Sequence, residues 1–113
     1  MMELYVHTVG ATAVLVVSGR VSAEDAPLLK DRLASELAAH AHRLVVDLSR
    51  VDFMGSAGLG ALITGIKEAR AHQGDVILTA PSAVVQTLLH VSGLLGYVSH
   101  ATTVADAVTS IAH

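Results

Sequence analysis

An apolar strand that leads through a glycine-bearing turn into a helix start is the feature that most constrains the fold of this chain. Residues 47–63 carry it, and they read Asp-Leu-Ser-Arg-Val-Asp-Phe-Met-Gly-Ser-Ala-Gly-Leu-Gly-Ala-Leu-Ile. Ser56 falls where the helix should begin, and a helix start exposes unpaired backbone N–H groups and the positive end of the helix dipole. A serine there can cap the helix, or it can carry a phosphate that the same N–H groups stabilise.

The composition predicts one aliphatic domain. The chain has 113 residues, enough for one domain and too few for two. Hydrophobic residues make up 52% and charged residues 15%, which argues against disorder. With one Phe, two Tyr and no Trp, the core should be aliphatic, as is usual under parallel sheets. There is no cysteine, which excludes disulfides, thiol catalysis and thiolate metal sites.

Charge and hydropathy limit the classes of partner. The formal net charge is −3, and the seven Lys and Arg are scattered without a basic run. We therefore expect no nucleic-acid binding, because that function needs a basic patch and stacking aromatics. No apolar run approaches 18 residues and no signal peptide is recognisable, so we expect a cytoplasmic protein that does not bind a membrane.

The apolar pattern predicts the element order β-β-α-β-α-β-α-β-α. Capping boxes are expected at Ser22 with Asp25 and at Thr103 with Asp106, and Gly74 is expected to end the second helix. Strands are predicted at 4–8, 13–18, 44–48, 76–79 and 97–99, and helices at 22–40, 56–74, 81–91 and from 103 onward. This order implies a single domain over 1–113 with a mixed sheet, in which the first strand is an antiparallel edge and the later strands are parallel.

The topology also places a candidate site. In parallel sheets, sites form at the carboxyl ends of the strands. The turn at 19–22 and the loop at Ser56 both follow strands, so we expect them at the same edge of the sheet. The second helix should bury one face and expose small residues on the other. The buried face is expected to contain Leu59, Leu62, Ile63, Ile66 and Ala69, and the opposite face Ala57, Ala61, Thr64 and Gly65.

The small-residue face allows two interpretations. Glycine inside a helix costs about 1 kcal/mol relative to alanine, and this helix has Gly58, Gly60 and Gly65, so some gain should offset the cost. Either another protein approaches the backbone closely there, or a neighbouring helix of the same domain packs against it.

Two catalytic or ligand-binding interpretations of residues 55–60 fit poorly. A nucleophile elbow needs glycine two residues before the serine, and Met54 stands there. A phosphate-binding loop needs different glycine spacing and a lysine, and Lys67 lies well inside the helix. The third interpretation is a partner-recognition loop with a modifiable serine.

Residues 44–62 resemble the signature of the STAS domain family, and especially of bacterial anti-sigma-factor antagonists. The family pattern is an apolar strand, Asp-Leu-Ser, then Phe, an apolar residue, Asp, Ser, Ser or Thr, and Gly-Leu-Gly. The chain matches with Asp47-Leu48-Ser49 and with Phe53 to Gly60. The Gly19 turn, the Pro81-Ser82 helix start and the sequence Ser92-Gly93-Leu94 match as well, so the resemblance covers nearly the whole chain.

The resemblance implies a protein–protein switch. In the family, an anti-sigma factor that is an ATP-dependent serine kinase phosphorylates the serine at the position of Ser56, and a metal-dependent serine phosphatase reverses this. The unphosphorylated antagonist binds the anti-sigma factor and frees the sigma factor. The implied contact residues are Gly19, Arg20, Val21, Ser22, Gly55, Ser56, Ala57, Gly58, Gly60, Ala61 and Thr64.

The chain departs from the family pattern at three positions. Gly55 and Ser22 stand where the family usually has Asp, and Ala57 stands where it has a second Ser or Thr. These departures keep two alternatives open: a STAS scaffold that works without phosphorylation, and a small-ligand or nucleotide-sensing STAS module. In all three readings the chain is not an enzyme and has no cofactor of its own.

The seven histidines are not expected to form a metal site. His40 and His42 are two residues apart and would diverge on a helix. His72 falls near a helix C-terminus, where the dipole favours a partly charged imidazole. We therefore predict solvent-facing or capping roles for them.

Overall fold

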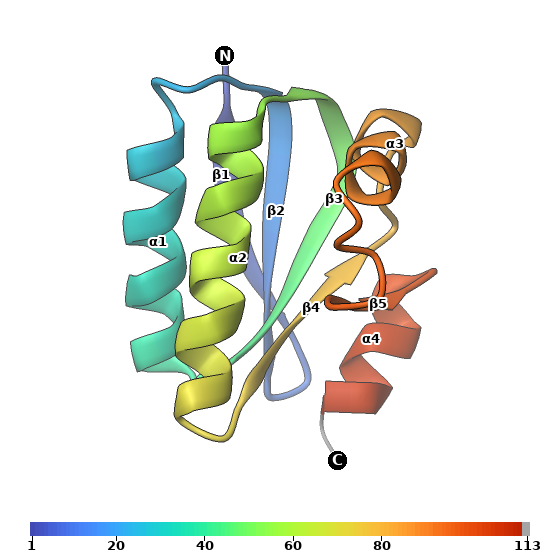
Figure 1. Ribbon diagram of the computed structural model, residues 1–113. Helices are drawn as coiled ribbons and strands as arrows, with labels where there is room; N and C mark the ends of the chain where they lie inside the picture. The colour runs from blue at the N-terminus through green and yellow to red at the C-terminus, as the bar shows by residue number, and fades with distance from the viewer. Residues whose placement is uncertain (112–113) are drawn as a thin grey trace.

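A five-stranded sheet with helices on both faces forms the fold (Figure 1). The computed structural model describes residues 1–111. In chain order the elements are β1 (Glu3–Val9), β2 (Thr12–Val21), α1 (Ala26–Ala39), β3 (Arg43–Met54), α2 (Ser56–Ala71), β4 (Asp75–Thr79), α3 (Ala83–Val91), β5 (Ser99–Ala101) and α4 (Val104–Ile111). The strands lie in the order β1-β2-β3-β4-β5; β1 pairs antiparallel with β2, and the remaining pairs are parallel. The predicted fold class, a mixed sheet with an antiparallel first edge strand, is confirmed.

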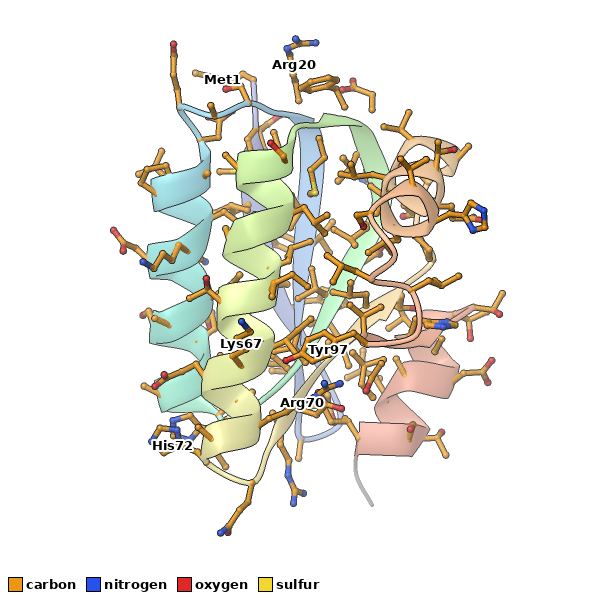
Figure 2. The ribbon with its side chains drawn as sticks, in the orientation of Figure 1. Met1, Arg20, Lys67, Arg70, His72 and Tyr97 are labelled. Carbon is orange, nitrogen blue, oxygen red and sulfur yellow. The ribbon has the colours of Figure 1, made fainter. Side chains whose placement is uncertain are left out.

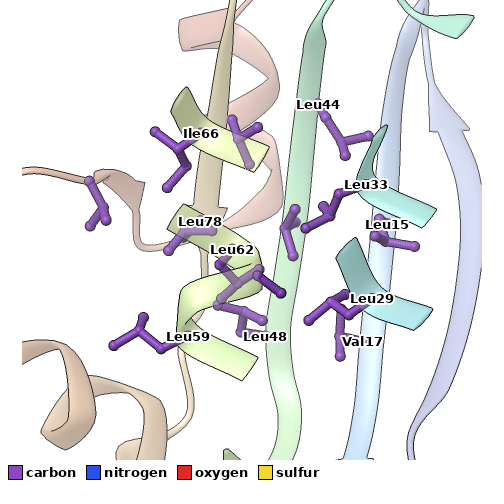
Figure 3. Packing of buried hydrophobic residues seen from close by; sticks show 14 of the residues in the cluster. Leu15, Val17, Leu29, Leu33, Leu44, Leu48, Leu59, Leu62, Ile66 and Leu78 are labelled. Atoms are coloured by element: carbon purple, nitrogen blue, oxygen red, sulfur yellow. The ribbon is translucent and has the colours of Figure 1, made fainter. Parts of the chain in front are cut away.

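Two apolar layers hold the sheet between the helices. On one face, α1, α2 and α3 cover a large aliphatic cluster, part of which Figure 3 shows. The predicted stripe of α1 is confirmed, since its buried residues are Ala26, Leu29, Leu33 and Leu37. On the other face, α4 places Ala107 and Ile111 against Val14, Val45 and Ile77. The central strands are therefore buried on both sides, which explains their continuous Val and Leu runs.

β2 and β3 are longer than the sequence pattern predicted. They pair in parallel as far as Val21 and Met54, with two register irregularities on the way. Val51 and Met54, which lie beyond the predicted strand 44–48, are buried in the core, where the sequence also predicts Met54. The strand was underestimated because polar residues interrupt its apolar pattern, whereas the ladder to β2 continues past them. These extensions bring both strand ends to the same edge.

The ends of the first two long helices differ from prediction. α1 begins at Ala26 with Asp25 as N-cap, so Ser22 lies in a turn before the helix. α2 ends with His72 as C-cap, and Gln73, at φ +65°, takes the left-handed position that was expected at Gly74. The amide of Gly74 donates to the Ala69 carbonyl and the amide of Gln73 to that of Arg70, which is the Schellman pattern.

The last strand is shifted by two residues from the predicted 97–99. The amides of Tyr97 and Val98 both donate to the Leu94 carbonyl, so they belong to the turn after α3. Ser99 is the first residue free to pair with Ile77. The predicted cap of α4 is present in part, because the amide of Asp106 donates to Thr103 Oγ1 at 3.1 Å. Among the described helices, none combines the length and the hydropathy that crossing a membrane requires.

Candidate functional site

The turn after β2 and the loop before α2 meet at one edge of the sheet. The amide of Gly55 donates to the carbonyl oxygen of Val21 at 3.1 Å, and Val21 pairs with Met54 in the strand ladder. The structure therefore brings together the two segments that the sequence placed at the carboxyl ends of strands. We call the exposed and half-buried residues here the Ser56 surface: Gly19, Arg20, Ser22, Gly55, Ser56, Ala57, Gly60 and Thr64.

Three of the predicted contact residues are buried and lie beneath this surface. Val21, Gly58 and Ala61 have no large exposed area. A Cβ added to Gly58 would lie 2.8 Å from Val21 Cγ1 and 3.0 Å from Met54 Cγ. Gly58 therefore lets the first turn of α2 pack directly on the end of β2. These residues support the Ser56 surface from below.

The predicted small-residue face of α2 is wrong in part. Gly65 is buried, and a Cβ there would lie 3.2 Å from Leu33 Cδ1 of α1. Ala61 is only 5% exposed and belongs to the same core cluster. The glycine at position 65 lets α1 and α2 approach each other, as the alternative interpretation held. Ala57 and Thr64 remain exposed, and Thr64 Oγ1 donates to the Gly60 carbonyl at 2.9 Å.

Ser56 is the first residue of α2 and not its cap. The N-cap is Gly55, with φ −85° and ψ 173°, and within residues 1–111 no side-chain hydrogen bond caps this helix start. The first intrahelical bond runs from the Leu59 amide to the Gly55 carbonyl, so the amides of residues 56–58 have no acceptor within the helix. No acidic side chain lies in the first turn of α2. An exposed hydroxyl thus lies beside free N–H groups at the positive end of a sixteen-residue helix.

Gly19 and Arg20 shape the neighbouring part of the site. Gly19 has φ +83°, and an added Cβ would collide with the carbonyl oxygen of Met1. Only glycine fits this turn while the N-terminal residue passes over it. The guanidinium of Arg20 lies 4.1 Å from the centre of the Phe53 ring, within cation–π range. Met1 and Arg20 lie at the end of the molecule where α2 begins (Figure 2). One sequence does not display the Arg20–Phe53 contact, because the two residues are paired across different strands.

A carboxylate is fixed in the same turn although Ser22 replaces the family's Asp. Asp25 Oδ2 accepts hydrogen bonds from the Ser22 amide at 3.0 Å and from the Ser22 hydroxyl at 2.9 Å. The Ser22 amide, and then the Ser22 hydroxyl, lower the pKa of Asp25 below its ordinary value. The turn therefore carries a fixed negative charge three residues after the position where the family pattern has one.

Other polar side chains have local structural roles or lie at the opposite end of α2. Asp47 Oδ1 accepts from the Ser49 amide at 2.9 Å, which is the local backbone role that such an Asp commonly has. The ligand-type side chains His42, Glu68 and His72 gather at the other end of α2, far along the helix from Ser56.

The chain is similar to several known proteins over most of its length. The sequence profile of the STAS domain matches residues 4–107. The chain is 30% identical over 80 residues to the anti-sigma-B factor antagonist of Listeria monocytogenes, covering 71% of this chain and 70% of that protein. The crystal structure of an anti-sigma factor antagonist from Mycobacterium paratuberculosis superposes with a TM-score of 0.88 at 26% identity, covering 100% of this chain and 96% of that one.

The fold also matches the anti-sigma factor antagonist SpoIIAA of Bacillus. Its unphosphorylated form has a TM-score of 0.81 at 21% identity, with 97% of this chain and 96% of that chain covered. A structure of SpoIIAA in the phosphorylated form gives a TM-score of 0.72 at 20% identity, with 98% and 99% covered. At this identity the likeness concerns the fold.

Proposed function

Because the chain belongs to the STAS domain family, we propose that it is an anti-sigma-factor antagonist. In this function it binds an anti-sigma factor through the Ser56 surface and so releases the sigma factor. The relatives from Listeria and Mycobacterium, which are anti-sigma factor antagonists, support the assignment. The chain then acts as a binding protein, and any chemistry belongs to its partner.

The observation that carries the proposal is the setting of Ser56. The hydroxyl is exposed, and it lies on a helix start that packs against the end of β2 through Gly58. Small residues surround it on α2, namely Ala57 and Gly60, so a partner could approach the backbone closely. The Arg20–Phe53 pair supplies a cation and an aromatic ring on β2 and β3, beside the same edge.

We further propose that phosphorylation of Ser56 by a kinase-type anti-sigma factor switches binding off, and that a serine phosphatase restores it. A phosphoserine carries about −1.5 to −2 charges at pH 7. The free amides and the helix dipole favour an anion at this place, so the domain should stay folded. The effect would act through the interface, where a hydrated dianion replaces a small hydroxyl. A hundredfold loss of affinity requires only about 2.7 kcal/mol.

A second function has a specific observation in its favour. Gly55 and Ser22 replace two acids of the family pattern, and these acids could be contacts that the kinase uses. In that case the chain would be a constitutive scaffold that binds its partner through the same surface and is never phosphorylated.

The test first identifies the partner by pull-down from the native cell with mass spectrometry, and then measures its affinity for variants. Ser56→Ala should bind like the wild type and resist ATP-driven release. Ser56→Glu should bind at least about a hundredfold more weakly with little change in melting temperature. Ser35→Glu is the matched control, since Ser35 is an exposed serine on α1.

Three outcomes separate the readings. Phosphate incorporation into Ser56→Ala at the wild-type level would place the switch at another residue. Equal affinity for wild type and Ser56→Glu, without phosphorylation of either, would favour the scaffold. Capture of no anti-sigma factor at all would contradict the antagonist function.

A further inference from the structure

Three metal-ligand side chains from two parts of the sequence meet at the C-terminal end of α2. His42 comes from the connection between α1 and β3, and Glu68 and His72 come from the last turns of α2. One ligand atom from each lies within 4.8 Å of the others. We propose that these residues form a binding site for a divalent transition-metal cation of the Zn²⁺ type. His72 marks it in Figure 2, at the end of the molecule opposite Arg20.

The backbone of His42 is held in place by its neighbours on both sides. Its amide donates to the Leu37 carbonyl at 2.8 Å, and its carbonyl accepts from the Asp75 amide at 3.0 Å. A Cβ added to Gly74 would overlap the His42 carbonyl oxygen, so the turn after α2 lies directly against this residue. His42 itself has φ +60°, a left-handed conformation that histidine tolerates better than most residues. The connection therefore presents His42 to the end of α2 in a defined position.

The hydrogen bonding of His72 prepares its ring for a metal. Nδ1 lies 3.0 Å from the backbone carbonyl oxygen of Glu68. A carbonyl only accepts, so in the neutral ring Nδ1 donates to it and Nε2 keeps its lone pair. Nδ1 also lies 3.8 Å from Glu68 Oε1, so the carboxylate must swing toward Nε2 to share an ion with it. Metal-bound histidines commonly donate their second N–H to a carbonyl in this way, which orients the ring. The C-terminal end of a helix also favours a cation.

Binding requires a local closure of the side chains. The His42 and His72 rings are stacked, with centroids 4.0 Å apart and planes 5° from parallel. Lone pairs in parallel planes cannot converge on one ion, so the His42 ring must turn about its Cβ–Cγ bond while His72 keeps its hydrogen bond to the Glu68 carbonyl. Tetrahedral Zn²⁺ places its ligand atoms about 3.4 Å apart, whereas the three ligand atoms here lie within 4.8 Å of one another. The side chain of Glu68 is 53% exposed, which leaves its carboxylate room to move toward the ion.

The ligand set selects the class of metal. Two imidazole nitrogens and one carboxylate oxygen suit Zn²⁺ and similar cations, with water in the fourth position. Mg²⁺ and Ca²⁺ prefer oxygen ligands throughout. A bound cation would tie the α1–β3 connection to the end of α2 and so stabilise the domain, independently of what the Ser56 surface binds.

The test is a titration of the full chain with ZnCl2, followed by calorimetry and thermal melting. We expect saturable binding of one ion per chain and a melting temperature raised by about 10 °C at a free Zn²⁺ concentration of 100 times Kd. His72→Asn, Glu68→Gln and His42→Asn should each weaken binding at least about tenfold. Asparagine is chosen for position 42 because it tolerates the left-handed backbone and binds Zn²⁺ poorly.

His40→Asn is the matched control. His40 Nε2 lies 3.4 Å from Glu36 Oε1 at the C-terminal end of α1. Glu36 and His40 are four residues apart, as Glu68 and His72 are, so they form a second His–Glu pair with the same spacing. This variant should bind Zn²⁺ like the wild type. In long-range ¹H–¹⁵N spectra, Zn²⁺ should shift His72 Nε2 while Nδ1 keeps its proton.

Three results would overturn the proposal. One is the absence of saturable Zn²⁺ binding by the wild type. Another is wild-type affinity in His72→Asn, which would place the ion elsewhere. The third is an equal effect of His40→Asn, which would mean that exposed histidines bind Zn²⁺ without a defined site.

Discussion

The amide of Gly55 donates a 3.1 Å hydrogen bond to the carbonyl oxygen of Val21, so the N-cap of α2 is tied to the last residue of β2. Two segments more than thirty residues apart in sequence are therefore joined by a direct backbone contact. The contact of Gly58 with Val21 strengthens this link from the buried side. The Ser56 surface is thus positioned by a backbone hydrogen bond and by the buried contact beneath it.

The link predicts the effect of Gly58→Ala. The added methyl group would lie 2.8 Å from Val21 Cγ1, and a β-branched side chain in a strand cannot move away easily. Overpacking typically costs 1–3 kcal/mol, and the better helix propensity of alanine returns about 1 kcal/mol. We expect a net loss of about 1 kcal/mol in the free energy of unfolding, measured by urea denaturation.

A double-mutant cycle with Val21→Ala checks the cause. Val21→Ala alone leaves a cavity and destabilises the domain. If the clash is the cause, the double variant should be more stable than the sum of the single effects predicts, by about 0.5 kcal/mol or more. Strict additivity of the two changes would show that Gly58→Ala acts in another way.

Two other glycines of α2 form a matched pair. Gly60 is exposed and a Cβ there meets nothing within 4 Å, so Gly60→Ala should stabilise the domain by about 0.5–1 kcal/mol. Gly65→Ala makes the same change in propensity but places a Cβ 3.2 Å from Leu33 Cδ1. Gly65→Ala should therefore stabilise the domain less than Gly60→Ala does, or destabilise it. An equal increase in the urea midpoint for Gly60→Ala and Gly65→Ala would mean that Leu33 and α1 move aside at no cost in stability.

The same geometry changes what Gly65→Arg would do. If position 65 faced outward, arginine would leave the fold intact and block a partner. Because Gly65 is buried against α1, arginine would separate the helices or bury an unpaired charge. We expect a large drop in melting temperature, so this variant does not probe the interface, whereas a substitution at the exposed Thr64 does.

The fold and the place of the site were predictable because each rests on local pattern and a topological rule. The stripe of Leu29, Leu33 and Leu37 has helical spacing and was confirmed without change. The meeting of the 19–22 turn with the Ser56 loop follows from two parallel strands that end at one edge. The short apolar runs of β2 and β4 identified buried strands because both faces of the sheet are covered.

Other features depend on contacts that one sequence does not display. Small residues such as Ala61 and Gly65 fit a buried helix contact and an open surface equally well, and only the position of α1 decides between them. Gln73 takes the left-handed turn because Gly74 is needed where the His42 carbonyl approaches. The Glu68–His72 spacing was visible in the sequence, but the approach of His42 depends on that turn.

The Ser22–Asp25 contact predicts a pH effect. Hydrogen bonds from Ser22 lower the pKa of Asp25 in the folded state. A carboxyl group with a depressed folded pKa contributes stability above its unfolded pKa, and that stability is lost as the pH falls through the folded pKa. Ser22→Ala removes the hydroxyl and keeps the amide, which is the larger cause. The pKa of Asp25 should rise part of the way to its ordinary value, as measured by NMR titration.

The control for this change is Ser35→Ala, an exposed serine on α1 that should leave the Asp25 titration unchanged. The stability difference between Ser22→Ala and the wild type should be present at neutral pH, and the part due to Asp25 should vanish once the carboxyl is protonated in both. An unchanged Asp25 pKa in Ser22→Ala would show that the backbone amide alone holds the charge.

Thr79, at the end of β4, carries a buried hydroxyl, and replacing this hydroxyl should stabilise the domain. Its side chain is 0% exposed, and among residues 1–111 no hydrogen-bond partner reaches Oγ1. Burying an unpaired hydroxyl costs about 1–3 kcal/mol in protein mutational data. Valine has nearly the same shape and an equally strong preference for strands. Thr79→Val should therefore raise the free energy of unfolding by about 1 kcal/mol, measured by urea denaturation. Thr79→Ser, which keeps the hydroxyl and removes the methyl group, should lower it. A lower urea midpoint for Thr79→Val would mean that the hydroxyl has a partner after all, such as a buried water.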